Sequence, residues 1–236
     1  MPTKLILIRH GITEWNLKKR YCGFMDINLS EKGKKQAQRL NKRLKKENIP
    51  IYNVYSSDRK RALQTAKIVF KGFSVEKVSD LREMHFGVFE GLTYRQIIRK
   101  YPHIYRKWLD DPSCATIPGG ENLSDFKKRV ITALRKIIRF NRNKTVAVVS
   151  HGGAISIFLT DILKMEPTSR RRRGGSLGEM PKRPSVIRTL KGTVLWPRGI
   201  KDFWRYIPSA ASLTIVEYKN GKPKIRLLND TAHLNG

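Results

Sequence analysis

The stretch Lys4-Leu5-Ile6-Leu7-Ile8-Arg9-His10-Gly11 decides the fold class of this sequence. Its apolar residues 5–8 are too few for a helix and too uniformly apolar for a half-exposed strand, so they predict a buried strand of a parallel or mixed sheet. Arg9 and His10 then lie at the carboxyl end of that strand, where open α/β sheets bind ligands. Gly11 permits a sharp turn and a close ligand approach. This pattern indicates either an anion site containing a nucleophile or a strand end that merely faces water.

A second stretch favours the anion site. Residues 145–149, Thr-Val-Ala-Val-Val, again predict a buried strand, and Ser150-His151-Gly152-Gly153 follows it. Two such strands lying side by side would bring His10 and His151 to the same rim of one sheet.

The intervening pattern alternates strands with helices and predicts an α/β fold. Ser30 is the expected N-cap of a helix that ends near Asn48, and Ser57 or Asp58 is the expected cap of the next helix, with Arg61 in its first turn. Further expected elements are strands at 51–55 and 73–78, helices within 93–108 divided at residue 102, helices at 123–139 and 153–164, and a hairpin over 212–228 with an Asn-Gly turn.

The chain has 236 residues, of which 39% are hydrophobic, and we expect them to form one domain over residues 1–236. No apolar run approaches the roughly 20 residues that cross a bilayer, and no signal-peptide pattern opens the sequence. We therefore expect a cytoplasmic protein without a membrane partner. Cys22 and Cys114 do not form a disulfide framework, and we interpret both as reduced and incidental.

The charge balance is strongly basic. Lys and Arg number 49 against 19 Asp and Glu, which gives a formal net charge of +30. Ion-pair networks need similar numbers of both signs and do not account for this excess. Three interpretations stay open: steering of anionic substrates, binding of nucleic acid, and solubility or cellular context.

Residues 166–201 fit no regular element. They contain four arginines at 170–173, two following glycines and four prolines. A structureless stretch of about 35 residues within a compact domain is a functional lid or a disordered insertion, and we favour a mobile basic insertion.

Five motifs in this order resemble the histidine phosphatase superfamily, the phosphoglycerate-mutase-like clan. They are Arg9-His10-Gly11 with Asn16, Ser56-Ser57-Asp58 with Arg61-Ala62 and Thr65-Ala66, Leu81-Arg82-Glu83 with Phe86-Gly87 and Glu90-Gly91, Pro118-Gly119-Gly120-Glu121, and Ser150-His151-Gly152-Gly153.

The resemblance covers residues 4–164 and resumes over 202–234. Within the clan the chain most resembles the α-ribazole phosphatase and broad-specificity phosphatase branch, because the segment from Glu83 to Pro118 is short and a Gly-Gly-Glu loop follows. It implies a three-layer α/β sandwich with a mostly parallel central sheet, helices on both faces, a small helical cap and a C-terminal hairpin.

The resemblance also implies the site residues. His10 would attack phosphorus and form a phosphohistidine, and adjacent guanidinium groups would keep it neutral. Arg9 and Arg61 would grip phosphoryl oxygens in bidentate fashion. His151, protonated when the dianion binds, would add a donor. Asn16, Thr13 and Gly152 would complete the phosphate pocket, with no cofactor and no metal.

Glu83 matches the proton donor of the family and would first protonate the leaving alkoxide and then activate water. Glu90 and Glu14 are the rival carboxylates. The remaining histidines, His85, His103 and His233, we interpret as structural or surface residues. A metal site on His10 and His151 is disfavoured, because flanking arginines would repel a cation.

The sequence therefore predicts a phosphomonoesterase acting on a small phosphorylated metabolite, α-ribazole 5′-phosphate being one candidate. A mutase of the same clan and a nucleic-acid-binding protein on this scaffold stay as alternatives. Ile12 departs from the polar residue of many relatives, which bears on substrate preference. We expect residues 93–108, with the insertion, to supply the pocket walls, and the sequence leaves a dimer or another oligomeric state open.

Overall fold

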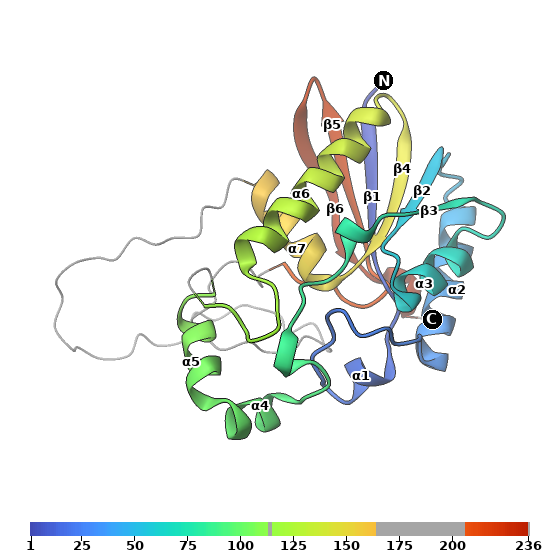
Figure 1. Ribbon diagram of the computed structural model, residues 1–236. Coiled ribbons are helices and arrows are strands. Elements are labelled where there is room, and N and C mark those ends of the chain that lie inside the picture. Colours follow the sequence, from blue (N-terminus) through green and yellow to red (C-terminus); the bar gives the residue numbers. More distant parts are fainter. Residues whose placement is uncertain (113–114, 164–205, 236) are drawn as a thin grey trace, which may run out of the picture.

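The computed structural model describes residues 1–112, 115–163 and 206–235, and a six-stranded sheet is its central layer (Figure 1). The strand order is β3-β2-β4-β1-β5-β6. Adjacent strands among the first four pair in parallel, and β5 and β6 join antiparallel, which confirms the mostly parallel α/β fold. The strands are β1 (Thr3–Arg9), β2 (Asn53–Ser56), β3 (Val75–Lys77), β4 (Thr145–Ser150), β5 (Leu213–Lys219) and β6 (Lys222–Asp230).

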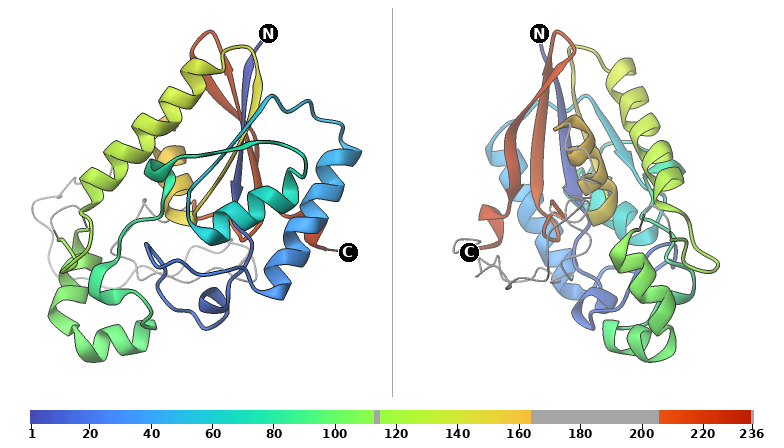
Figure 2. Two further views of the ribbon diagram at one scale, coloured as in Figure 1. Left: turned by 45° about the vertical axis from the view of Figure 1, so that its right-hand side comes forward. Right: turned by 90° about the vertical axis from the view of Figure 1, so that its left-hand side faces the viewer.

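Strand β1 is buried on both faces. Leu5 and Leu7 pack in one apolar cluster with α6 (Leu123–Phe140) and α7 (Gly152–Ile162), whereas Ile6 and Ile8 pack in a second cluster with the other two long helices, α2 (Glu31–Lys46) and α3 (Lys60–Val69). Full burial of each such side chain stabilises the fold by about 1.5–3 kcal/mol. Figure 2 shows the helices on both sides of the sheet, so the uniformly apolar run in β1 reflects a central strand.

Helix α2 begins where the sequence predicts. The Ser30 hydroxyl accepts a hydrogen bond from the Gly33 N–H at 3.1 Å, and Ala37, Leu40 and Leu44 are buried on one face. A Cβ on Gly11 would lie 2.6 Å from the Gly33 carbonyl oxygen. The turn after β1 and the first turn of α2 are thus in backbone contact, which fixes the loop beside the histidine.

The predicted cap of α3 is wrong. Arg59 is the N-cap residue and makes no side-chain cap hydrogen bond. Asp58 instead accepts from the Arg82 guanidinium, and the Ser57 hydroxyl contacts His151. Both predicted caps are therefore committed to tertiary contacts that local sequence does not reveal.

A small helical cap lies beyond the carboxyl ends of the parallel strands (Figure 1). It comprises α1 (Glu14–Leu17), α4 (Tyr94–Lys100) and α5 (Pro102–Asp110), with the 3-10 turns Ser79–Leu81 and Gly87–Phe89 preceding α4. Ile97, Tyr105 and Trp108 are buried in this cap, whereas Ile98 is 39% exposed.

The C-terminal hairpin is confirmed. Asn220 and Gly221 both have positive φ, 52° and 74°, as a two-residue type I′ turn between β5 and β6 requires. A 3-10 turn, Ala232–Leu234, follows β6. The expected insertion at 166–201, its arginine run and Cys114 lie outside the described residues. Within the described ranges, no helix is both long and apolar enough to span a bilayer.

Candidate active site

Parallel pairing of β1 with β4 brings the two histidines together. Arg9 lies opposite Ser150 in the register, and the His10 N–H donates to the Ser150 carbonyl at 3.0 Å. The imidazole centroids of His10 and His151 are 5.2 Å apart, with their planes inclined by 64°. Two segments separated by about 140 residues thus meet at one rim of the sheet, as the matching strand ends predict.

The His10 ring is held as a neutral base. Its Nδ1 lies 2.7 Å from the Gly11 carbonyl oxygen, which accepts only, so Nδ1 carries the hydrogen. Its Nε2 accepts from the Nε–H of Arg61 at 3.3 Å. Burial, followed by the charges of Arg61 and Arg9, lowers the pKa of His10 well below its ordinary value. Nε2 is therefore unprotonated at neutral pH, and its lone pair faces Arg61.

Arg61 is buried and firmly anchored. Its two terminal nitrogens donate to the carbonyls of Met25, at 2.9 Å, and Gly23, at 2.7 Å, while Nε faces His10. Arg9 donates from Nη1 to the Pro208 carbonyl at 2.6 Å. Burial lowers the pKa of Arg9, but the ordinary pKa of a guanidinium is so high that the Arg9 side chain stays charged. Two guanidinium groups thus lie beside one neutral imidazole.

Glu83 is a buried carboxyl at the amino end of α7. Its Oε1 accepts from the Met84 N–H at 3.0 Å, and its Oε2 accepts from the Gly153 N–H at 2.8 Å. Burial raises the pKa of Glu83, and this outweighs the opposing effects of the two hydrogen bonds and of Arg61 and Arg9. A raised pKa suits a group that gives and takes a proton near neutral pH.

The rival carboxylates lie elsewhere. The Glu90 oxygens accept from the N–H groups of Phe24 and Met25 at 2.7 and 2.8 Å, so this side chain fixes the loop that carries the carbonyl partners of Arg61. Glu14 is exposed on α1. Neither lines the cavity beside His10, whereas Glu83 does.

Ser57 contacts His151 and was missed as a site residue by the sequence reasoning. Its Oγ lies 2.8 Å from His151 Nε2, both residues are fully buried, and His151 Nδ1 has no hydrogen-bond partner. Burial, followed by the charge of Arg61, lowers the pKa of His151, so the ligand-free ring is neutral rather than protonated. The only sequence signal was a serine directly after a strand, which also fits a helix cap.

Of the three predicted phosphate donors Thr13, Asn16 and Gly152, two line the cavity beside His10 and one does not. Thr13 is fully buried and does not line the cavity, because its hydroxyl donates to Asn16 Oδ1 at 2.9 Å in the cap of α1. Asn16 and Gly152 do line the cavity. A Cβ on Gly152 would lie 3.0 Å from Ile207 and 3.3 Å from the Arg9 guanidinium carbon, so a larger residue there would crowd the site.

The cavity beside His10 has a volume of about 180 Å³. Its walls come from residues 19–22 and 207–210 rather than from 93–108, so that expectation is wrong for the described residues. Cys22 lines the cavity with a free thiol whose pKa is raised by burial. No group of three or more His, Cys, Asp or Glu side chains suited to a metal gathers in residues 1–112, 115–163 and 206–235.

A family model of the histidine phosphatase superfamily (branch 1) matches residues 5–180. The chain belongs to this superfamily. Within it, phosphoserine phosphatase 1 of Hydrogenobacter thermophilus is 37% identical over 150 residues, which are 63% of this chain and 70% of the relative. Adenosylcobalamin/α-ribazole phosphatase of Salmonella typhimurium is 32% identical over 168 residues, 70% and 82% of the two chains.

A solved structure extends the similarity to the fold. The phosphoserine phosphatase of Entamoeba histolytica, crystallised as a mutant with phosphoserine, matches with a TM-score of 0.74 and 28% identity, covering 98% of this chain and 99% of the other. The resemblance inferred from the five motifs is thus confirmed, and this histidine phosphatase is an enzyme with phosphatase activity.

Proposed function

We propose that this histidine phosphatase hydrolyses the phosphate monoesters of small metabolites through a phosphohistidine on His10 Nε2. One observation carries the proposal. The Gly11 carbonyl holds the hydrogen on Nδ1, and Nε2 therefore presents a lone pair beside Arg61 and 5.2 Å, ring to ring, from a second imidazole.

In the first half-reaction, the His10 Nε2 lone pair forms a bond to phosphorus while the bond from phosphorus to the ester oxygen breaks. The departing alkoxide takes the proton of the Glu83 carboxyl. Burial supports this role because it raises the pKa of Glu83 and so keeps the proton in place at higher pH.

In the second half-reaction, the Glu83 carboxylate takes a proton from water, and the water oxygen bonds to phosphorus. The bond from phosphorus to nitrogen breaks, its electron pair returns to Nε2, and inorganic phosphate leaves. Glu83 is again protonated, so the cycle closes without a cofactor or a metal ion.

The fixed charges would stabilise the transferring phosphoryl group. Arg9, which lines the cavity, and Arg61, which contacts His10 Nε2, offer guanidinium donors, and Asn16 adds an amide. His151 would donate from Nδ1, because Ser57 occupies Nε2. Anchoring by the carbonyls of Met25 and Gly23 means that Arg61 needs little reorganisation during the reaction.

The substrate proposal rests on the cavity and on the relatives. A volume of about 180 Å³ fits the phosphoryl end of a small metabolite, and Lys19 and Arg20 add positive charge to its wall. α-Ribazole 5′-phosphate and phosphoserine are the two substrates to compare, since relatives are named for both.

Brief exposure to a ³²P-labelled phosphomonoester, followed by denaturation, tests the intermediate. We expect label that is stable to alkali and lost in acid on the wild type, and none on His10→Ala. A substrate with a good leaving group needs little help from Glu83, so Glu83→Gln should retain more label because dephosphorylation still needs the base. An unlabelled wild type that hydrolyses the ester, or a label that survives in His10→Ala, would contradict the proposal.

A screen of phosphorylated metabolites then tests the substrate class. We expect inorganic phosphate as the product, with kcat/KM highest for a small monoester. Transfer of the label to a second hydroxyl in place of water would identify the mutase reaction instead.

A further inference from the structure

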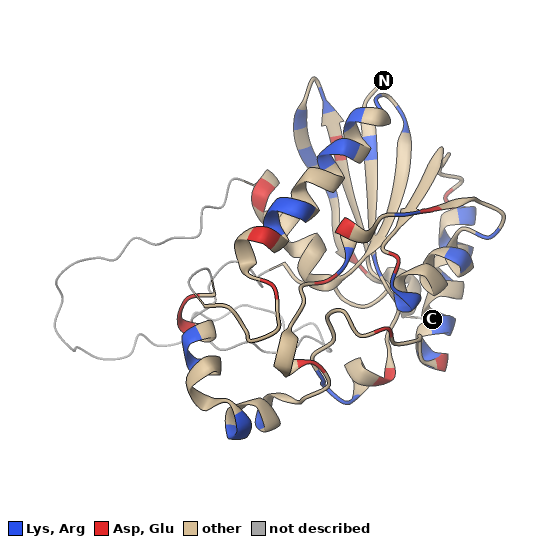
Figure 3. Cartoon of the chain, in the orientation of Figure 1, with Lys and Arg blue, Asp and Glu red and all other residues tan. Residues whose placement is uncertain are grey.

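The phosphatase site uses few of the cations in this chain. The net charge is +30, yet the cavity beside His10 is lined by three Lys or Arg side chains in the described residues, Arg9, Lys19 and Arg20. Figure 3 shows many other basic residues on the helices, among them those of α2. Phosphoryl transfer does not account for these.

One group of basic residues borders a groove between α2 and α3. The groove has a volume of about 720 Å³ and is lined by eight residues, five of them basic and none acidic. They are Lys35, Gln38, Arg39, Asn41, Lys42, Lys67, Ile68 and Lys71. No residue of the groove lines the catalytic cavity.

The cations form two rows along the groove. Lys35, Arg39 and Lys42 follow a spacing of four and three residues on one face of α2, whereas Lys67 lies in the last turn of α3 and Lys71 in the turn after that helix. All five side chains are exposed, and none of them forms an ion pair in the described part of the chain. Two facing rows of unpaired cations in a concave surface are complementary to a linear polyanion.

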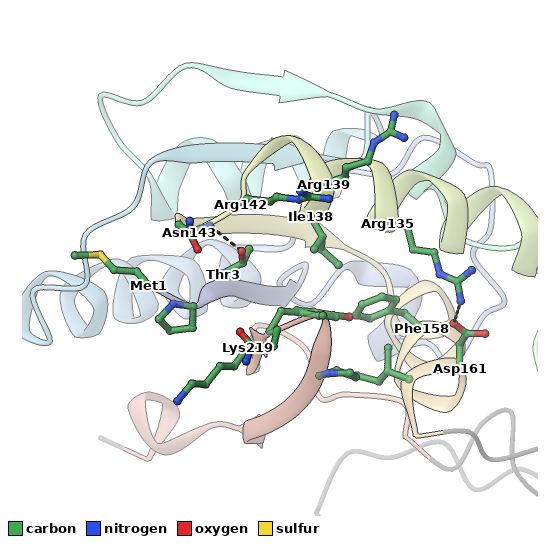
Figure 4. Close-up of a pocket in the computed structure, with 16 residues that line it drawn as sticks. Met1, Thr3, Arg135, Ile138, Arg139, Arg142, Asn143, Phe158, Asp161 and Lys219 are labelled. Atoms are coloured by element: carbon green, nitrogen blue, oxygen red, sulfur yellow. Dashed lines mark hydrogen bonds and ion pairs between the residues drawn. The ribbon is translucent and has the colours of Figure 1, made fainter.

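A second cleft gives the contrast. It has a volume of about 850 Å³ and lies at the amino end of β1, where Met1 and Thr3 line it (Figure 4). Here Arg135 donates to the Asp161 carboxylate at 2.9 Å, and apolar side chains such as Ile138 and Phe158 line the wall. Its charge is partly neutralised, whereas the groove between α2 and α3 contains no acid at all.

We propose that the groove between α2 and α3 binds the phosphate backbone of a nucleic acid. Backbone recognition requires cations that follow a line of phosphates, and amides such as Gln38 add hydrogen-bond donors. A membrane surface is flat and its stable binding requires apolar side chains that insert. The groove offers a concave surface and, as its only apolar lining residue, the half-buried Ile68.

Fluorescence anisotropy of a labelled 20-nucleotide oligothymidylate, titrated with the full-length chain over a range of salt concentrations, tests the proposal. The groove variant combines Lys35→Gln, Lys42→Gln, Lys67→Gln and Lys71→Gln. Arg39 is kept, because its guanidinium donates to the Leu234 carbonyl at 3.0 Å. The matched control combines Arg139→Gln, Arg142→Gln, Lys219→Gln and Lys222→Gln, which removes the same charge from the region of the second cleft.

We expect the groove variant to bind at least about tenfold more weakly than the control. The slope of log affinity against log salt should fall by about 0.7 for each lost phosphate contact, and so by about 2.8 for four. Both variants should hydrolyse p-nitrophenyl phosphate at the wild-type rate, which shows that they are folded.

Three results would overturn the proposal. The first is a wild type that does not bind the oligonucleotide at about 50 mM salt, where phosphate contacts are strong. The second is an equal loss in both variants, which would assign binding to net charge alone. The third is tighter, groove-dependent binding to phosphatidylserine vesicles or polyglutamate, which would assign the groove to a membrane or to an acidic protein.

Discussion

The two strand ends that carry His10 and His151 have the same local design, but their neighbours contact opposite ring nitrogens. At the end of β1, the Gly11 carbonyl occupies Nδ1 of His10 and leaves Nε2 to contact Arg61. At the end of β4, the Ser57 hydroxyl occupies Nε2 of His151 and leaves Nδ1 without a partner. The same strand–His–Gly pattern thus fits the two roles proposed above, a nucleophile at His10 and a hydrogen-bond donor at His151.

The difference arises from the neighbours of each strand end. A carbonyl can only accept, so it fixes the hydrogen of His10 on Nδ1. A hydroxyl both donates and accepts, so the donor role proposed for His151 requires the Ser57 hydroxyl to donate to Nε2 and the ring hydrogen to lie on Nδ1. The two proposed roles thus require the same Nδ1–H tautomer, with a different ring nitrogen facing the protein at each strand end.

Exchange of the two imidazoles for alanine gives the largest expected contrast. His10→Ala should lower kcat by about 10⁴-fold or more, because it removes the nucleophile that forms the covalent bond. His151→Ala should lower kcat by about 10²- to 10³-fold, because it removes one donor to the transition state. Steady-state rates with rapid-quench labelling measure both. Equal losses, or loss of the phosphoenzyme in both variants, would contradict the division of roles.

Ser57→Ala tests the tautomer at the second strand end. We expect kcat to fall about tenfold, equivalent to ~1.4 kcal/mol, because one buried hydrogen bond that orients the ring is lost. Ser57→Thr keeps the hydroxyl and should restore most of the rate. The ¹⁵N shifts of labelled histidine give an independent measurement. The wild type should show His151 with its hydrogen on Nδ1, and the alanine variant should lose this preference; an Nε2–H ring in the wild type would disprove the assignment.

The smallest expected effect concerns stability against pH. The pKa values of His10 and His151 are lowered in the folded chain, mainly by burial, so below about pH 6.5 the unfolded chain binds protons that the folded chain does not. The free energy of unfolding should therefore decrease as the pH falls from 6.5, by up to ~1.4 kcal/mol per pH unit for each histidine.

Glu83 changes the free energy of unfolding with pH in the direction opposite to the two histidines. Its pKa is raised, so its contribution is present at low pH and is lost as the pH rises from about 4.5 through the folded pKa. Urea unfolding between pH 4.5 and 7.5 measures the sum, and His151→Gln should reduce the decrease below pH 6.5. An unchanged slope in that variant would show that His151 is not the group responsible.

Several features of this protein follow from its sequence alone, because they depend on neighbours along the chain. The apolar run in β1, the Ser30 cap and the Asn220-Gly221 turn each satisfy a local backbone requirement, and the structure has them where they were predicted. The histidine-bearing strand ends were predicted to meet for a related reason, since carboxyl ends of adjacent parallel strands share one rim.

Tertiary structure alone decided the partners of those strand ends. Ser57 and His151 are 94 residues apart, and Arg9 and the Pro208 carbonyl are 199 apart, so no local period connects them. Cys22, interpreted as incidental, lines the cavity for the same reason. Hydrogen bonds and cavity walls form between surfaces that the fold brings together, and they decide which ring nitrogen of each histidine has a protein partner, a choice that spacing along the chain does not determine.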